Sequence, residues 1–418
     1  MKFETISVVG LGYIGLPTAA VIASNGIRVV GVDVNQHAVD TINQGMIHIV
    51  EPGLEDLVKR AVNDGHLTAH TSPQKADAFL IAVPTPFKGE EHEPDLKYIE
   101  SASRALAPML EKGNLVVLES TSPVGATEQM AKWLAEERSD LTFPHTVVEG
   151  QTPDIFVAHC PERVLPGQVI RELVENDRII GGMDEASTAA ATQVYKMFVK
   201  KGECIATSAR TAEMSKLTEN AFRDVNIAFA NELSLICDQQ GINVWELISL
   251  ANRHPRVNIL QPGCGVGGHC IAVDPWFIVN QNPEKAKMIR QARLVNDYKP
   301  RYVVEQVEKA VAGINNPKIA CLGLAFKPDI DDLRESPALD ITKKLSANPN
   351  YQILAVEPNI ESLPGTLGNN GNVRLKNLSD VLNEADVVVV LVKHKEFIGL
   401  CKSDIPNSKI FDFVNAIH

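Results

Sequence analysis

Three polar side chains share one face of a long helix predicted near the middle of the chain. Apolar residues recur at three- and four-residue steps from Arg210 onward, which predicts a continuous helix ending at Gly241. Lys216, Asn220 and Arg223 then lie at i, i+4 and i+7, within an arc of roughly 60°. Two cations and an amide on one rigid face could hold an oxyanion and an anionic substrate. The alternative is an ordinary solvated helix surface.

A glycine-rich loop places a cysteine close to a carboxylate. Four glycines fall within residues 263–268, and such a run suits neither a helix nor an ordinary strand, so the backbone must approach something closely. Cys270 follows and precedes Asp274 by four residues, which indicates a positioned thiol with a carboxylate nearby. Cys264, His269 and Cys270 could instead bind zinc, or the thiol could be buried and inert. The chain has no paired C-x-x-C, so no metal is predicted.

The N-terminus carries a glycine turn in the setting that a dinucleotide requires. A short apolar run at residues 6–9 leads into the turn, a helix is predicted at 17–24, and a second apolar run at 28–32 ends in Asp33. The turn consists of Gly10, Leu11, Gly12, Tyr13, Ile14 and Gly15. Glycines permit the tight turn and bring a pyrophosphate close to the helix N-terminus, where free N–H groups favour anions.

Asp33 selects between the two nicotinamide cofactors. Its carboxylate would accept hydrogen bonds from the adenosine ribose but would repel a 2′-phosphate. Two unit charges about 4 Å apart repel by roughly 4 kcal/mol at an effective dielectric constant near 20. The sequence therefore predicts NAD, and not NADP, as the cofactor.

Three further apolar runs end in polar loops. The runs lie at residues 78–83, 115–118 and 155–158. In open α/β sheets ligands bind outside the carboxyl ends of the strands, so these loops supply site candidates. The candidates are Thr85, Thr121, Thr127, Glu162 and Arg163. The alternative is ordinary turn chemistry, since Thr-Pro and Ser-Pro punctuate loops in any case.

The strand pattern of the first half returns near the C-terminus. Apolar runs at 318–323, 351–357 and 385–392 repeat, in the same order, the runs at 6–10, 27–33 and 76–83. Three matching blocks predict a second doubly wound domain. Its first turn lacks the full glycine set, so it need not bind NAD. Lys327 and Arg334 follow that turn, and these cations favour a nucleotide diphosphate at this position.

The predicted fold class is α/β, with two doubly wound Rossmann-like domains joined by a central helical dimerisation domain. We expect the NAD-binding domain at residues 1–205, the central domain at 206–314 and the C-terminal domain at 315–418. The segment from Pro283 to Ala312 should be largely helical but broken at Pro300.

Composition excludes several classes of partner. The net charge of −12 over 418 residues argues against nucleic acid or anionic membrane, so an anionic ligand must meet a local basic cluster. Seven scattered cysteines suit a reducing cytoplasm. Glu4, the glycines and Pro17 interrupt the N-terminal apolar run, which therefore makes a poor signal peptide, and no other run approaches the ~18 apolar residues of a membrane span.

Taken together, the motifs resemble one family over essentially the whole chain. GLGYIGLP, VPTPF, ESTSPVG, CPERVLPG, AEMSKLTENAFRD, GVGGHCIAVDP and GLAFKPDIDDLRESP occur in the order seen in the UDP-glucose/GDP-mannose 6-dehydrogenases. Those enzymes oxidise the C6 alcohol of a nucleotide sugar to a carboxylate and consume two NAD⁺ in one active site. The resemblance implies a UDP-sugar substrate, a cytoplasmic enzyme of polysaccharide precursor synthesis, and a homodimer, or a higher homo-oligomer, formed by the central helices.

The resemblance also implies a role for individual residues. Cys270 corresponds to the nucleophile that traps the aldehyde as a thiohemiacetal, later a thioester, and Lys216 to the group that assists proton transfer and stabilises the oxyanion. A four-electron oxidation needs a group that holds the aldehyde between two hydride transfers, which a thiol provides. The implied catalytic set is Cys270, Lys216, Asn220, Asp274, Thr121 and Glu162. The implied substrate contacts are Arg163, Val164, Lys216, Asn220, Arg223, His254, Arg256, Gly267, Phe326, Lys327 and Arg334, and the family's counterpart of Arg256 can reach a neighbouring subunit's site.

Two positions depart from the common family pattern. Val273 stands where many UDP-glucose enzymes have a lysine, and the stretch from Asp412 to Ala416 lacks the basic residue of a C-terminal substrate contact. CPERVLPG, NRHPRV and CIAVDPW resemble the acetamidosugar branch of the family, and this resemblance implies UDP-N-acetyl-D-mannosamine as the substrate, with UDP-N-acetylglucosamine and UDP-glucose as alternatives. A β-hydroxyacid or 6-phosphogluconate-type dehydrogenase would share the dinucleotide turn and the helical lysine–asparagine pair, but Cys270 and the second α/β half count against it. A non-catalytic NAD-binding regulator is a third class.

Overall fold

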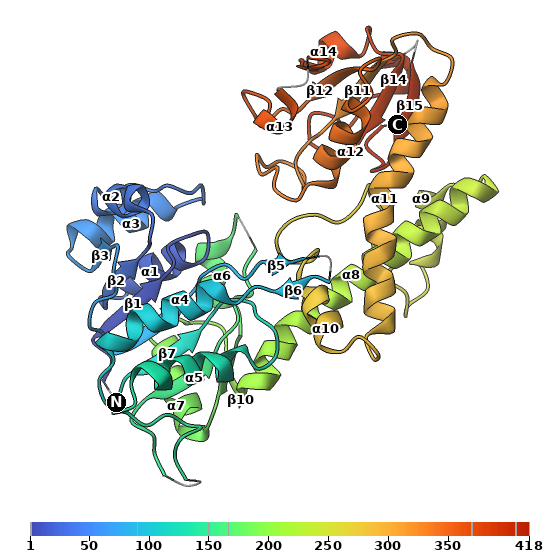
Figure 1. Ribbon diagram of the computed structural model, residues 1–418. Coiled ribbons are helices and arrows are strands. Elements are labelled where there is room, and N and C mark those ends of the chain that lie inside the picture. The colour runs from blue at the N-terminus through green and yellow to red at the C-terminus, as the bar shows by residue number, and fades with distance from the viewer. Residues whose placement is uncertain are drawn as a thin grey trace. The chain divides into compact units, whose positions relative to one another are not determined.

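The apolar runs of the N-terminal half form an eight-stranded sheet with the order β10-β9-β8-β7-β4-β1-β2-β3 in this computed structural model (Figure 1). The structure describes residues 2–89, 91–148, 151–165, 167–368, 371–405 and 408–417. The strands are β1 (Thr5–Val9), β2 (Arg28–Val32), β3 (Leu67–His70), β4 (Ala78–Ile81), β7 (Leu115–Leu118), β8 (Phe156–His159), β9 (Arg178–Gly182) and β10 (Cys204–Ser208). Paired strands run parallel except β8 and β9. The carboxyl ends of β1, β4, β7 and β8 therefore share one edge. A separate antiparallel pair is formed by β5 (Phe87–Lys88) and β6 (Glu93–Pro94).

Helices cover both faces of this sheet. Successive strand residues point to opposite faces, so Val8 joins one apolar cluster and Val9 the other. The first cluster is completed by α1 (Gly15–Ser24), α2 (Gln36–Asn43), α3 (Leu54–Asn63), α6 (Val169–Glu175) and α7 (Glu185–Tyr195). The second is completed by α4 (Lys97–Leu106), the short 3₁₀ helix η1 (Ala107–Met109) and α5 (Ala126–Glu137). The first half is thus a doubly wound α/β domain, as predicted.

The C-terminal sheet repeats this plan with five parallel strands. Its order, β13-β12-β11-β14-β15, matches the order β3-β2-β1-β4-β7 of the first sheet, which confirms the predicted internal repeat. The strands are β11 (Lys318–Leu322), β12 (Gln352–Val356), β13 (Val373–Leu375), β14 (Val387–Val390) and β15 (Lys409–Asp412). The accompanying helices are α12 (Pro337–Ser346), α13 (Gly365–Gly368), α14 (Leu378–Val381) and the 3₁₀ helix η2 (Lys402–Asp404). Apolar clusters again lie on both faces of the sheet.

Two long and two short helices lie in the middle of the described chain. They are α8 (Ala209–Gln240), α9 (Val244–Ala251), α10 (Asp274–Gln281) and α11 (Lys287–Val311). The predicted helix that ends at Gly241 is α8, and Gly241 has the left-handed φ of +68° that favours glycine. Asn243 caps α9 by accepting hydrogen bonds from the N–H groups of Trp245 and Glu246. The chain divides into two compact units, residues 1–218 and 219–418, and the division falls within α8.

The predicted break at Pro300 was wrong. Helix α11 runs from Lys287 to Val311 with Pro300 inside it, and Figure 1 draws it as one continuous helix. A proline removes one backbone hydrogen bond and crowds the preceding turn, which destabilises a helix by ~3 kcal/mol. Here the flanking turns are held from outside, because Asn296 and Lys299 are buried and bonded to side chains of α8. Tertiary contacts thus outweigh the local penalty.

None of the helices in the described ranges is both long and apolar enough to cross a membrane.

Candidate active site

The first β-turn-α unit has the shape that a bound dinucleotide requires. Gly10 has a φ of +92°, and a Cβ added there would lie 2.6 Å from the carbonyl oxygen of Ala82. A Cβ on Gly15 would lie 1.7 Å from the carbonyl oxygen of Gly10, so neither position tolerates a side chain. At Gly12 an added Cβ would meet nothing within 4 Å, which leaves room for a pyrophosphate. The turn, with Tyr13 and Ile14 inside it, therefore fits NAD.

Asp33 stabilises this turn and remains partly exposed. Its Oδ2 accepts a hydrogen bond from the N–H of Leu11 at 2.9 Å, and its Oδ1 accepts one from the N–H of Asn35 at 2.8 Å. Each carboxylate oxygen can accept more than one hydrogen bond, so a ribose hydroxyl can still bind. Thr85 follows β4, and its buried Oγ1 has no partner among the described residues, which is consistent with a donor or acceptor for the cofactor.

Thr127 donates hydrogen bonds to the carboxylate of Glu213, a residue that was not among the predicted site residues. Glu213, in the second turn of α8, is 1% exposed. Its Oε1 accepts hydrogen bonds from the N–H and the hydroxyl of Thr127, at 2.8 and 2.7 Å, and its Oε2 accepts one from the N–H of Gly125. Glu213 thereby caps α5 from another helix and holds the loop that carries Thr121. Its only signal in the sequence was its position three residues before Lys216, which gives no indication of the distant partner.

Two carboxylates and one guanidinium share the interior next to the ends of β7 and β8. Glu162 Oε2 lies 2.7 Å from Nη1 of Arg178, and its Oε1 accepts the N–H of Arg163, so both oxygens have partners. Glu119 Oε1 accepts a hydrogen bond from the Tyr195 hydroxyl at 2.5 Å. Burial, and then the charge of Glu162, raise the pKa of Glu119 to about 7, against the lowering effect of Tyr195. A proton on Glu119 would leave this cluster neutral.

The other predicted site residues of this unit lie at or near its surface or beside its core. The predicted substrate residue Arg163 donates from Nη1 to the carbonyl oxygen of Asp177 at 3.1 Å, and Val164 packs against the core. Pro166, within the same motif, lies outside the described residues. Thr121 is partly buried at the end of β7, and Lys216 is partly buried on α8.

In the second unit an amide and a carboxylate meet near the predicted nucleophile. Asn220 Nδ2 donates to Asp274 Oδ2 at 2.5 Å, and the two residues are 7% and 2% exposed. Asp274 is the first residue of α10, and its N–H donates to the carbonyl oxygen of Cys270 at 2.8 Å. Cys270 itself is exposed. The structure thus combines an accessible thiol with a buried, hydrogen-bonded carboxylate one helical turn away in sequence.

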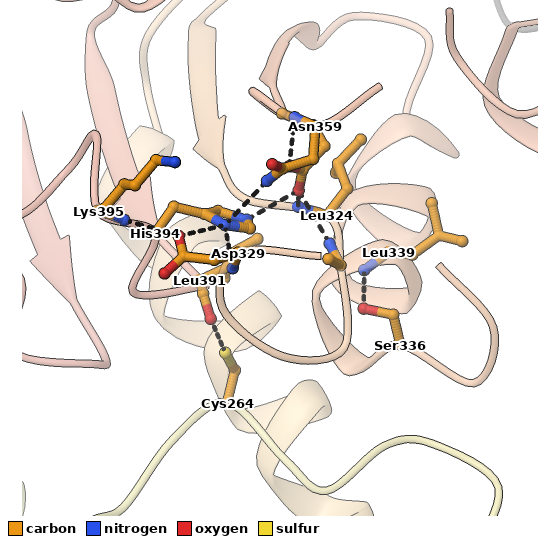
Figure 2. A network of polar contacts seen from close by, with 11 residues as sticks. Cys264, Leu324, Asp329, Ser336, Leu339, Asn359, Leu391, His394 and Lys395 are labelled. Carbon is orange, nitrogen blue, oxygen red and sulfur yellow. Dashed lines mark hydrogen bonds and ion pairs between the residues drawn. The ribbon is translucent and has the colours of Figure 1, made fainter. Parts of the chain in front are cut away.

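The glycine loop before Cys270 is held by the chain's own C-terminal segment. A Cβ on Gly267 would lie 2.3 Å from the carbonyl oxygen of Glu335, and one on Gly268 would lie 3.1 Å from the ring of Phe326. The predicted close approach is therefore confirmed, with protein backbone and a phenyl ring as the neighbours. Cys264 is buried, and its Sγ donates to the carbonyl oxygen of Leu391 at 2.8 Å (Figure 2).

The predicted cations of the second unit lie on several segments. Arg334 pairs with Asp332 at 2.7 Å, and Lys327 is partly buried in the loop after β11. Arg223 is exposed on α8. His254 and Arg256 are exposed in a loop whose ends are tied by Asn252, which bonds both the N–H and the carbonyl oxygen of Ile259. That asparagine closes the loop and was not predicted to do so.

Comparison with known proteins identifies the family. The chain matches the NAD binding domain, the central domain and the UDP binding domain of the UDP-glucose/GDP-mannose dehydrogenase family over residues 4–199, 210–298 and 320–418. The protein belongs to this family. It is an NAD-dependent nucleotide-sugar dehydrogenase with the predicted α/β architecture.

Individual relatives cover nearly the whole chain. UDP-N-acetyl-D-mannosamine dehydrogenase of Campylobacter jejuni is 68% identical over 99% of both chains. NDP-N-acetyl-D-galactosaminuronic acid dehydrogenase of Ralstonia solanacearum is 64% identical, over 95% of this chain and 92% of the relative. Among solved structures, that of UDP-D-ManNAc dehydrogenase from Pyrococcus horikoshii superposes with a TM-score of 0.87 at 39% identity, over 99% of this chain and 96% of that one.

Proposed function

We propose that the protein oxidises UDP-N-acetyl-D-mannosamine at C6 to UDP-N-acetyl-D-mannosaminuronate. The observation that carries the chemistry is the exposed Cys270, placed next to the buried Asn220–Asp274 pair. The identity of the sugar is supported by relatives at 68% and 63% identity that bear this enzyme's name. One alcohol, two NAD⁺ and one water yield one carboxylate, two NADH and three protons.

The residues divide the work as follows. NAD, when bound, accepts a hydride in each oxidation. The Cys270 thiolate adds to the C6 aldehyde and gives a thiohemiacetal, whose oxyanion is the group that Lys216 and Asn220 stabilise. The second oxidation leaves a thioester on Cys270. Water then breaks the C–S bond, frees the thiol and gives the carboxylate, with Asp274, Thr121 and Glu162 assigned to the water step.

The protein is acidic overall, so a local group of cationic side chains binds the anionic diphosphate of the nucleotide sugar. The proposed contacts are Arg163, Arg223, His254, Arg256, Lys327 and Arg334. Gly267 and Phe326 pack where the glycine loop meets the C-terminal segment, and Val164 borders Arg163. A Lys327→Ala variant should therefore raise the KM for the nucleotide sugar more than it lowers kcat.

One specific observation supports a second candidate substrate, an N-acetylgalactosamine sugar. The Ralstonia relative is 64% identical and is named for an N-acetylgalactosaminuronic acid. Competing UDP-N-acetylmannosamine, UDP-N-acetylgalactosamine, UDP-N-acetylglucosamine and UDP-glucose for kcat/KM tests the assignment, and we expect the mannosamine sugar to lead by at least tenfold. Two NADH per sugar support the proposed chemistry. One NADH would indicate a single-step dehydrogenase, and none a regulator.

We also infer a homodimer through the central helices. Phe222, Phe229 and Ile236 recur at seven-residue steps on α8 and are 69%, 50% and 44% exposed. An exposed apolar stripe of this kind marks an interaction surface. Sedimentation should give a dimer for the native protein and a monomer for Phe229→Glu.

We place the enzyme in the cytoplasm, where reduced cysteines and NAD are available.

A further inference from the structure

Glu357 repeats in the second sheet what Asp33 does in the first. It follows β12 as Asp33 follows β2, and its Oε2 accepts hydrogen bonds from the N–H groups of Leu324 and Ala325, at 2.8 and 3.0 Å. These two residues belong to the turn after β11, as Leu11 belongs to the turn after β1. The carboxylate is fully buried, with 0% of its side chain exposed.

The second sheet adds a histidine that the first turn lacks. His394 lies in the loop after β14 (Figure 2). It is 0% exposed, and its Nε2 lies 3.0 Å from Oε2 of Glu357. Its Nδ1 accepts a hydrogen bond from the backbone N–H of Asp329 at 2.9 Å. A backbone N–H can only donate, so Nδ1 must be the acceptor and Nε2 must carry the proton. The imidazole is therefore neutral and donates to the carboxylate.

The same contacts explain the ionisation of Glu357. Burial alone would raise its pKa, but the hydrogen bond from His394 and those from the backbone N–H groups of Leu324 and Asn359 outweigh burial and hold the pKa below its ordinary value. Glu357 is thus an anion that orients the imidazole ring.

These bonds enclose the loop that carries Phe326 and Lys327. The loop is held at its start by Glu357 and at its end by Asp329, whose N–H bonds His394 and whose Oδ1 accepts the N–H of Lys395 at 3.0 Å. Asp329 has a φ of +59°, a conformation that L residues rarely adopt, so the bonds maintain a strained turn. Lys327 stands between the two tethers.

The same geometry argues against a metal site formed by the side chains around His394. Asp329, His394 and Glu396 could offer atoms within 4.8 Å of one another. However, the Nδ1 lone pair already accepts the N–H of Asp329, so the histidine has no free ligand atom in this arrangement.

We propose that His394 is a positioning residue for the nucleotide, and that its neutral ring, bonded to Glu357 and to the Asp329 N–H, holds the Phe326–Lys327 loop in its binding conformation. This rests on the proposed function, in which that loop contacts the UDP moiety. The groups that face the ring are Glu357, the Asp329 carboxylate at 3.8 Å, Asn359 and the edge of Phe397.

Two substitutions separate the two bonds of the ring. His394→Asn retains an acceptor near Nδ1, while His394→Gln retains a donor near Nε2 and loses the acceptor for Asp329. A hydrogen bond contributes ~1 kcal/mol, so we expect His394→Gln to weaken UDP binding roughly fivefold to tenfold and His394→Asn by less than threefold. Calorimetry with UDP on the full chain measures this directly. Raised KM for the UDP-sugar with unchanged kcat, and unchanged KM for NAD, should accompany it.

Thermal melting curves establish that both His394 variants are folded before their affinities for UDP are compared with that of wild type. Lys327→Ala reports on the underlying function: if it leaves UDP binding unchanged, the assignment of the loop to UDP fails. If Lys327→Ala weakens binding while both His394 variants match wild type, or lose kcat equally, the positioning role of His394 is overturned.

Discussion

Asn220 Nδ2 and Asp274 Oδ2 lie 2.5 Å apart, and the pair joins α8 to the first turn of α10. Because the N–H of Asp274 also bonds the carbonyl oxygen of Cys270, the same residue connects the amide on α8 to the predicted nucleophile. Asp274 can therefore set the position of the segment that carries the thiol.

Exchanging the pair should separate geometry from charge. Asn220→Asp alone would bring two carboxylates into contact at a buried position, and Asp274→Asn would remove the anion, so each should lower kcat by about 10²-fold. The double variant, with asparagine at 274 donating to aspartate at 220, should regain about tenfold over either single change. If kcat of the double variant instead falls by the product of the two single losses, the hydrogen bond between residues 220 and 274 does not determine kcat.

The two loop cysteines should behave oppositely. Burial raises the pKa of Cys264 to about 12, and its thiol is bonded to Leu391, so it stays protonated and inert. Cys264→Ser should keep turnover within about threefold, while Cys270→Ser should lose acid formation by more than 10³-fold, since no thioester can form. Iodoacetamide should label Cys270 and the exposed Cys401 but not Cys264. Labelling of Cys264 with loss of activity would move the nucleophile.

Lys216→Ala should lower kcat by about 10²–10³-fold, the usual cost of removing one oxyanion-stabilising group, with a smaller change in KM for the nucleotide sugar. Arg223→Ala is the matched control on the same helix face, and as a contact to the diphosphate it should raise KM more than it lowers kcat. Steady-state kinetics on both variants test this. A Lys216→Ala enzyme within a few-fold of wild type would return this face to an ordinary solvated surface.

Asp33→Ala should raise the KM for NAD by one to two decades, because a hydrogen bond to a charged group contributes about 1.5–3 kcal/mol. The change also removes two bonds that hold the turn, to Leu11 and Asn35. Asp33→Asn removes the charge and keeps one carbonyl acceptor, so it loses only one of the two backbone hydrogen bonds. It should narrow the difference between the KM values for NAD and NADP, with a smaller rise in the KM for NAD than Asp33→Ala causes. A wild-type preference for NADP would refute the assigned contact.

Glu119 predicts a specific pH dependence of stability. Its pKa is about 7 in the folded protein against an ordinary 4.5, so the folded state binds the proton more tightly. Stabilisation from this group is complete below about pH 4.5 and is lost as the pH rises through 7, with a slope of at most about 1.4 kcal/mol per pH unit. Melting temperatures of Glu119→Gln and wild type, compared from pH 5 to 8, should therefore diverge, with wild type losing more. Parallel profiles would contradict a proton on Glu119.

The fold could be predicted because burial leaves a periodic record in the sequence. Short apolar runs such as residues 115–118 became fully buried strands, and the three matched blocks became two sheets of the same strand order. The break expected at Pro300 is absent because side-chain contacts from Asn231 and Ser234, which are distant in sequence, hold the helix on both sides of the proline. Local rules fail where tertiary contacts outweigh them.

Site residues could be predicted only where the residues that act together lie in one short segment of the sequence. The glycine turn, Asp33 and the thiol loop each have a local motif, and their geometry agrees with it. Glu213, which bonds Thr127 from 86 residues away, has no such motif, and neither has His394, which bonds Glu357 from 37 residues away. Their partners are brought together only by folding. The catalytic and substrate roles remain predictions that the experiments above address.

The buried polar contacts between α8 and α11 allow only one alignment of the two helices. Asp224 bonds Arg293 and Asn296, Asn231 bonds Asn296 and the N–H of Gly263, and Ser234 accepts from Lys299. A slip of one turn, about 5.4 Å, would leave each of these buried groups without its partner. Since Asn231 also anchors the start of the loop that leads to Cys270, the alignment of the helices sets how much chain separates that anchor from the thiol. An insertion of a single residue between Gly263 and Cys270 should therefore be more damaging to turnover than the loss of any one of these bonds.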